Sequence, residues 1–186
     1  MSSEKKEKKI NKLLWIDLEM SGLDVNKEVI IECAAIITNM NFDTLDTYET
    51  VVYQEQKYID HMDAWNKKHH GESGLIAKIP LGKKSNIVEA ELINLIEKHF
   101  SNEDEKKPIL CGNSISQDRL FISKYWPQLD SKLHYRMCDV SSWKVIFNNI
   151  YDLKFKKQDK HRALDDIQES INELKFYLSH IPIDIT

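Results

Sequence analysis

The feature that most constrains the fold is an apolar stretch at residues 13–23 that contains two acidic residues, Asp17 and Glu19. Its composition is typical of a buried strand, and side chains two residues apart on a strand project from the same face. The two carboxylates would therefore repel each other and lose hydration, which destabilises a fold unless positive charge lies between them. A divalent metal with oxygen ligands, such as Mg²⁺, would supply that charge. Alternatively, one acid faces solvent and the other caps the turn at Ser21 and Gly22.

The pattern after this stretch predicts an α/β fold. Apolar runs indicate two further strands, and the short links between the three strands favour an antiparallel meander. Helical periodicity then alternates with short apolar runs. Strands are expected at residues 13–23, 29–38, 45–53, 108–112 and 134–140, and helices at 86–100, 118–126, from 141 or 142 onward, and at 161–180. This order predicts a mixed sheet, an antiparallel meander plus parallel strands, with helices on both faces.

The chain of 186 residues is expected to form one domain, residues 13–181, between two tails at 1–12 and 182–186. The first tail mixes five lysines with two glutamates and has no hydrophobic run, so we expect a flexible charged segment rather than a targeting signal. No apolar run approaches the roughly 18 residues of a membrane span. The cysteines Cys33, Cys111 and Cys138 are widely spaced in apolar segments. This spacing favours buried reduced thiols and predicts a cytoplasmic protein.

The charge balance limits the kind of nucleic acid that the protein could hold. The sequence has 26 basic and 30 acidic residues, a net charge of −4. Proteins that bind long nucleic acids by their phosphates usually have a basic surface. If this protein acts on nucleic acid, we therefore expect it to hold only a few nucleotides, through metals and local contacts.

Two later acids stand in a similar apolar setting. Asp118 and Asp166 each lie at the start of a predicted helix, and sites in open sheets form where strands end and helices begin. Together with Asp17 and Glu19 they would suit two Mg²⁺ or Mn²⁺ ions about 3.5–4 Å apart, an arrangement used for phosphodiester cleavage. His161 precedes the last helix and could take a proton from an attacking water. Alternatively, Asp118 and Asp166 only stabilise helix N-termini, and His161 is a surface histidine.

The order of these residues resembles the DEDDh class of 3′–5′ exonucleases, which have an RNase H-like fold. Within that class, several segments are most similar to the oligoribonuclease family: WIDLEMSGL at residues 15–23, MDAWN at 62–66, GNSISQDR at 112–119, YRMCDVS at 135–141 and HRALDDI at 161–167. The resemblance covers about residues 13–178. Ser116 stands where the family often has Gly, and Cys138 where it often has Leu. Residues 145–160 diverge and lack the usual Trp-Lys-Pro.

The resemblance implies a homodimeric, metal-dependent enzyme that degrades very short RNAs, down to dinucleotides, to 5′-mononucleotides. It also implies roles for residues outside the metal site. Leu23 would wedge against the bases, Trp65 and His70 would line the substrate pocket, and Tyr135 would enter the site from the partner subunit. Ser114, Arg136 and Ser141 would receive the 5′-phosphate of the substrate. The alternative for Leu23 and Trp65 is that they pack in the core.

Two other functions remain open. The chain could be a DEDDh exonuclease that trims or proofreads longer RNA or DNA 3′ ends, which the acidic balance disfavours. It could also be a catalytically inactive relative that only binds nucleic acid. The presence of all five catalytic residue types disfavours this second alternative.

Overall fold

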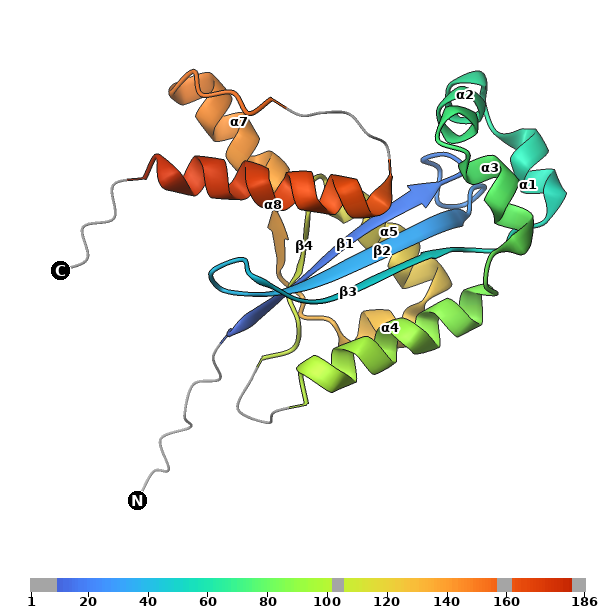
Figure 1. The fold of residues 1–186 in the computed structure, drawn as a ribbon, viewed down its shortest axis with the longest axis horizontal. Coiled ribbons are helices and arrows are strands. Elements are labelled where there is room, and N and C mark those ends of the chain that lie inside the picture. Colours follow the sequence, from blue (N-terminus) through green and yellow to red (C-terminus); the bar gives the residue numbers. More distant parts are fainter. Residues whose placement is uncertain (1–9, 102–105, 157–161, 182–186) are drawn as a thin grey trace.

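A computed structural model describes residues 10–101, 106–156 and 162–181. The predicted tails therefore lie mostly outside the described residues. Figure 1 shows the arrangement of the elements. In chain order they are β1 (Lys12–Met20), β2 (Ile30–Asn39), β3 (Thr44–Val51), α1 (Gln56–His61), α2 (Ala64–Glu72), α3 (Leu75–Lys78), the 3₁₀ turn η1 (Ile79–Leu81), α4 (Ser85–His99), β4 (Leu110–Gly112), α5 (Ser116–Tyr125), α6 (Pro127–Lys132), β5 (Met137–Asp139), α7 (Val140–Ile150) and α8 (Ala163–Ser179).

The strands of the described chain form one sheet in the order β3-β2-β1-β4-β5. β1 pairs with β2, and β2 with β3, in antiparallel register, whereas β4 runs parallel to both β1 and β5. The predicted mixed sheet, a meander plus parallel strands, is confirmed. β2 is buried along nearly its whole length because it lies inside the sheet with helices over both faces.

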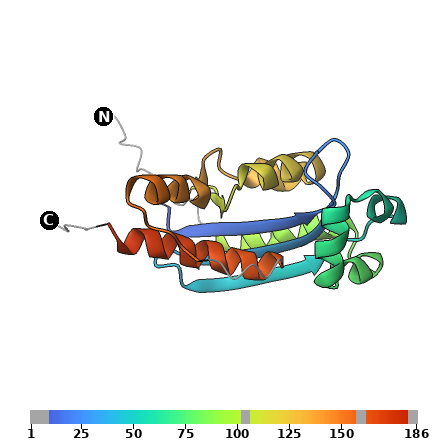
Figure 2. The ribbon, with the colours of Figure 1, turned by 90° about the horizontal axis from the view of Figure 1, so that it is seen from above.

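Helices cover the two faces of the sheet, as the sequence predicted. α7 and α8 pack against one face through Phe147, Ile167 and Ile171, while α4, α5 and α6 pack against the other. Figure 2 shows α8 in front of the strands and α4 behind them. None of the helices in the described ranges is long and apolar enough to cross a bilayer.

The alternation of side chains along β1 sets the position of the acids. Leu14, Ile16 and Leu18 pack toward α4 and α5, while Leu13 and Trp15 pack toward α7 and α8. Because the period of a strand is two, Asp17 and Glu19 continue the face of Leu13 and Trp15. That face leads to the first turn of α8.

The turn that follows β1 is closed by residues other than these two acids. The Ser21 hydroxyl donates to Glu28 Oε2 at 2.6 Å, and the backbone N–H of Val29 donates to Ser21 Oγ at 3.0 Å. Glu28 therefore takes the place that the alternative interpretation gave to Asp17 or Glu19. This leaves both β1 carboxylates on the face toward α8.

Candidate active site

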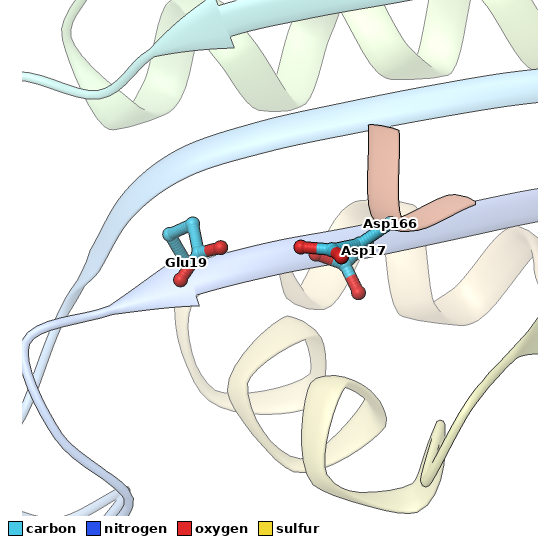
Figure 3. A group of neighbouring side chains, drawn as sticks. All are labelled: Asp17, Glu19 and Asp166. Atoms are coloured by element: carbon cyan, nitrogen blue, oxygen red, sulfur yellow. The ribbon is translucent and has the colours of Figure 1, made fainter. Parts of the chain in front are cut away.

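Three carboxylates meet where β1 passes the start of α8. Asp17 and Glu19 come from β1 and Asp166 from the first turn of α8, as Figure 3 shows. One oxygen of each carboxylate lies within 4.8 Å of an oxygen of the other two. The structure thus brings together three of the four acids that the sequence singled out, from segments nearly 150 residues apart.

A buried ion pair fixes the start of α8 over the sheet. Glu32 lies on β2 directly opposite Glu19 and is fully buried. Its carboxylate accepts from Arg162 Nε at 3.1 Å and from Arg162 Nη2 at 2.7 Å, and also from the backbone N–H of Ala163 at 3.3 Å. Paired guanidinium hydrogen bonds fix direction as well as distance. Because the Asp166 N–H donates to the Arg162 carbonyl oxygen, the same clamp orients Asp166.

The electrostatics of the cluster favour a bound cation. Burial first, and then the neighbouring charges of Asp166, Glu32 and Asp118, together raise the pKa of Glu19 to about 8, against a smaller lowering by Arg162. Protons or a metal can relieve this repulsion. Carboxylate oxygens are the ligands that hard divalent cations prefer, so the residues present fit such an ion.

Asp118 lies beside the cluster and has a different partner. It is 6% exposed, and its Oδ1 accepts from the backbone N–H of Leu18 at 3.0 Å. Burial raises the pKa of Asp118 to about 7, against the lowering effect of the Leu18 N–H. Asp118 is outside the group of three carboxylates within 4.8 Å, although its charge acts on Glu19. His161, the predicted base, lies outside the described residues.

The residues expected to contact bases lie around the end of β1. Leu23 is 74% exposed and Trp65 is 59% exposed, so core packing does not account for either side chain. Trp65 stacks on His69 at 3.8 Å between ring centroids, on a helix whose N-terminus is capped by Asp63. His70, on the same helix, is buried, and its Nε2 lies 3.1 Å from the Met20 carbonyl oxygen. Its Nδ1 lies 4.0 Å from Glu19 Oε2, which brings α2 to the acid cluster.

Two of the residues expected to bind the 5′-phosphate, Ser114 and Ser141, lie where β4 and β5 end, whereas Arg136 directly precedes β5. Ser114 follows β4 and Ser141 follows β5, and their hydroxyl oxygens are 3.1 Å apart. Ser114 has a backbone φ of 51°, a conformation that costs energy for a residue with a side chain and often marks a functional position. Arg136 is exposed, and its guanidinium lies 5.4 Å from the ring centroid of Tyr135, itself 76% exposed.

The chain is similar to known proteins along nearly its whole length. A model of the Exonuclease family matches residues 14–174. The chain is 42% identical over 176 residues to an oligoribonuclease of Dichelobacter nodosus, covering 93% of this chain and 96% of that protein. It is 44% identical over 168 residues to an oligoribonuclease of Francisella tularensis, covering 89% of this chain and 93% of that protein. The chain belongs to the oligoribonuclease family.

Solved structures show the same fold at much lower sequence identity. This oligoribonuclease family member superimposes on Escherichia coli exonuclease I with a TM-score of 0.70 at 12% identity. The match covers 94% of this chain and 42% of that one, so the chain spans less than half of the exonuclease. Exonuclease I from Methylocaldum szegediense gives a TM-score of 0.70 at 13% identity, covering 92% of this chain and 41% of that chain. The predicted RNase H-like α/β fold is confirmed.

Sequence reasoning missed the residues that support the site from behind. In the sequence, Glu32 is a single acid within a predicted apolar strand. Asn113 has the pattern of an ordinary turn residue and Glu173 that of an ordinary helix residue. In this oligoribonuclease family member Glu32 and Glu173 are 0% and 1% exposed. A lone acid within an otherwise apolar pattern is the signal that could have marked Glu32, because buried acids are rarely unpaired.

Proposed function

We propose that this chain is a 3′–5′ exoribonuclease that hydrolyses very short RNA oligonucleotides, dinucleotides above all, to 5′-mononucleotides. The observation that carries the proposal is the group formed by Asp17, Glu19 and Asp166. It occurs in a chain that is 42% identical to an oligoribonuclease over nearly the whole length of both.

We assign the metal ligands to Asp17, Glu19, Asp118 and Asp166, which would hold two divalent ions, Mg²⁺ or Mn²⁺. Such ions neutralise charge on the phosphodiester and make water a better nucleophile near neutral pH. His161 takes the proton of the attacking water, because an imidazole is half-protonated close to that pH. Glu32 and Arg162 hold the α8 end of the site in register with β1.

The substrate is held at both ends. Leu23 and Trp65 present exposed apolar surface on which bases can stack. His70, whose Nδ1 is 4.0 Å from Glu19 Oε2, would line the substrate pocket together with Trp65. Ser114, Ser141 and Arg136 bind the 5′-phosphate, for which the planar fork of arginine is well suited. We call Ser114, Ser141 and Arg136 the phosphate cap. An RNA of several nucleotides would have to displace this cap.

We propose further that the protein is a homodimer in which Tyr135 enters the site of the partner. Tyr135 is exposed, and α7, which begins at Val140, also exposes Val145, Ile146 and Ile150. Sedimentation should then give twice the 21.9 kDa mass of the chain. Mixing the inactive variants Tyr135→Ala and Asp17→Ala should restore activity, because each mixed dimer has one intact site. Mixtures that stay inactive while forming dimers would contradict this assignment. The cytoplasmic location stays a prediction from the sequence.

The experiment that tests the function is hydrolysis of an end-labelled RNA ladder of two to about twenty nucleotides, with Mg²⁺ and with EDTA. We expect the dinucleotide to be hydrolysed fastest and EDTA to stop hydrolysis. A rate that rises steadily with length would favour an exonuclease that trims longer ends. Binding without hydrolysis in either condition would favour a nucleic-acid-binding relative.

A further inference from the structure

A buried carboxylate behind the phosphate cap contacts the turn after β4. Glu173, on α8, is 1% exposed. Its Oε1 accepts from the Tyr177 hydroxyl at 3.0 Å, and its Oε2 accepts from Asn113 Nδ2 at 3.1 Å. Burying an acid is costly unless its oxygens are hydrogen-bonded, so these contacts are part of what stabilises Glu173 in this position.

The acid fixes which way the Asn113 amide points. A carboxylate only accepts hydrogen bonds, so the amide nitrogen must face Glu173, and the amide oxygen must face the other way. That oxygen accepts from the Ser141 hydroxyl at 3.2 Å. Ser141 Oγ in turn lies 2.8 Å from the Ser114 backbone nitrogen, whose N–H it accepts. Asp139 Oδ1 holds the backbone of both serines, accepting from the Ser114 N–H at 3.0 Å and from the Ser141 N–H at 2.9 Å, and the Asn113 amide orients the Ser141 hydroxyl.

The same amide also contacts the helix that carries a metal ligand. Asn113 Nδ2 donates to Ser170 Oγ at 2.8 Å, and Ser170 Oγ donates to the carbonyl oxygen of Asp166 at 2.9 Å. A continuous set of hydrogen bonds therefore runs from Asp166 through Ser170 and Asn113 to Ser141. It joins the two ends of the substrate site through the protein interior.

We propose that Asn113 and Glu173 are positioning residues that fix the distance between the 5′-phosphate cap and the metal-binding acids, and so select dinucleotides. This inference rests on the proposed function. A fixed distance favours the substrate whose 5′-phosphate reaches the cap when its scissile bond is at the acids. The serine hydroxyl protons can rotate toward a phosphate while their oxygens stay in place. Removing or reorienting the Asn113 amide should therefore weaken binding of the 5′-phosphate without altering the chemical step.

The test compares three substrates in Mg²⁺: a dinucleotide with a 5′-phosphate, the same dinucleotide with a 5′-hydroxyl, and a 5′-phosphorylated pentanucleotide. We expect Asn113→Ala to lower kcat/KM for the 5′-phosphorylated dinucleotide by about tenfold or more, the value of one hydrogen bond to a charged group. The loss should appear in KM, with kcat retained and with little change for the other two substrates. Glu173→Gln keeps the size of the side chain but allows the amide to turn over, so it should act in the same direction.

The matched control is Asn172→Ala, an exposed asparagine on α8 next to Glu173. It should leave all three substrates unchanged. Equal losses on all three substrates in Asn113→Ala and Glu173→Gln would mean a merely structural role and would overturn the inference. If Asn113→Ala does not fold, Glu173→Gln alone decides, and unchanged selectivity in it also overturns the inference. A wild-type protein without preference for the 5′-phosphorylated dinucleotide would instead contradict the proposed function.

Discussion

Replacing Glu19 by Gln should stabilise the metal-free protein while removing one of the proposed metal ligands. The pKa of Glu19 is raised from 4.5 to about 8, with burial as the largest cause. A raised pKa means that the folded state binds a proton more tightly than the unfolded chain. The bound proton therefore stabilises the folded state fully below pH 4.5, and this stabilisation is lost as the pH rises through 8. Glutamine carries no charge at any pH and avoids this loss.

The magnitude follows from the pKa difference. One pKa unit corresponds to about 1.4 kcal/mol, so ionising Glu19 at pH 8 costs the folded state up to about 5 kcal/mol. For a chain of this size, each kcal/mol shifts the melting temperature by roughly 2–4 °C. We expect metal-free Glu19→Gln to melt at least ~4 °C above the wild type at pH 8. The difference should shrink toward pH 5, where Glu19 is protonated.

The assay is thermal unfolding in EDTA from pH 5 to pH 8, repeated with Mg²⁺. Because a ligand that binds the folded state stabilises it, Mg²⁺ should raise the melting temperature of the wild type more than that of Glu19→Gln. The exposed Glu72→Gln in α2 serves as the control and should follow the wild type. Parallel pH profiles for wild type and Glu19→Gln in EDTA, or equal stabilisation of both by Mg²⁺, would refute the electrostatic account of the site.

Four further outcomes are expected. Asp17→Ala should abolish hydrolysis and leave a folded protein, as judged by circular dichroism. His161→Ala should lower kcat by about 10²–10⁴-fold with little change in dinucleotide binding, and a near-native kcat would require another base. Arg136→Ala should weaken dinucleotide binding about tenfold or more and flatten the dependence of affinity on length, which calorimetry would measure. Arg162→Ala leaves the buried Glu32 unpaired and should cost up to about 3–5 kcal/mol in urea unfolding, and an unchanged midpoint would show that the clamp is dispensable.

Local periodicity was enough to predict the strands and the direction of the acids. The alternation along β1 places Asp17 and Glu19 on one face whatever packs above them, and the apolar spacing of α8 is strongly helical. The sequence was less informative at Trp126 and Pro127, where we expected a helix simply to stop. Pro127 begins the short helix α6 instead, since proline is well tolerated at the first helical position.

Contacts between distant segments were the part that periodicity did not predict. Asp118 was expected beside the other acids because it starts a helix after a strand, but nothing local indicates that its carboxylate would accept the Leu18 N–H. Glu32 and Arg162 are 130 residues apart, and their pairing depends on how α8 crosses the sheet. Such pairs form only when the chain is folded, so the distances between their side chains cannot be predicted from the periodicity of a single sequence.

The position of Asp118 follows from the place where β1 and β4 separate. β4 pairs with β1 only at Leu14 and Trp15, and the Leu14 N–H donates to the Ile109 carbonyl oxygen. Hydrogen-bonding direction alternates along a strand, so the Leu18 N–H points to the same edge, beyond the end of β4. A buried N–H without an acceptor is costly, and Asp118 Oδ1 satisfies it. The gap left by the short strand is thus what brings the start of α5 to the acids of β1.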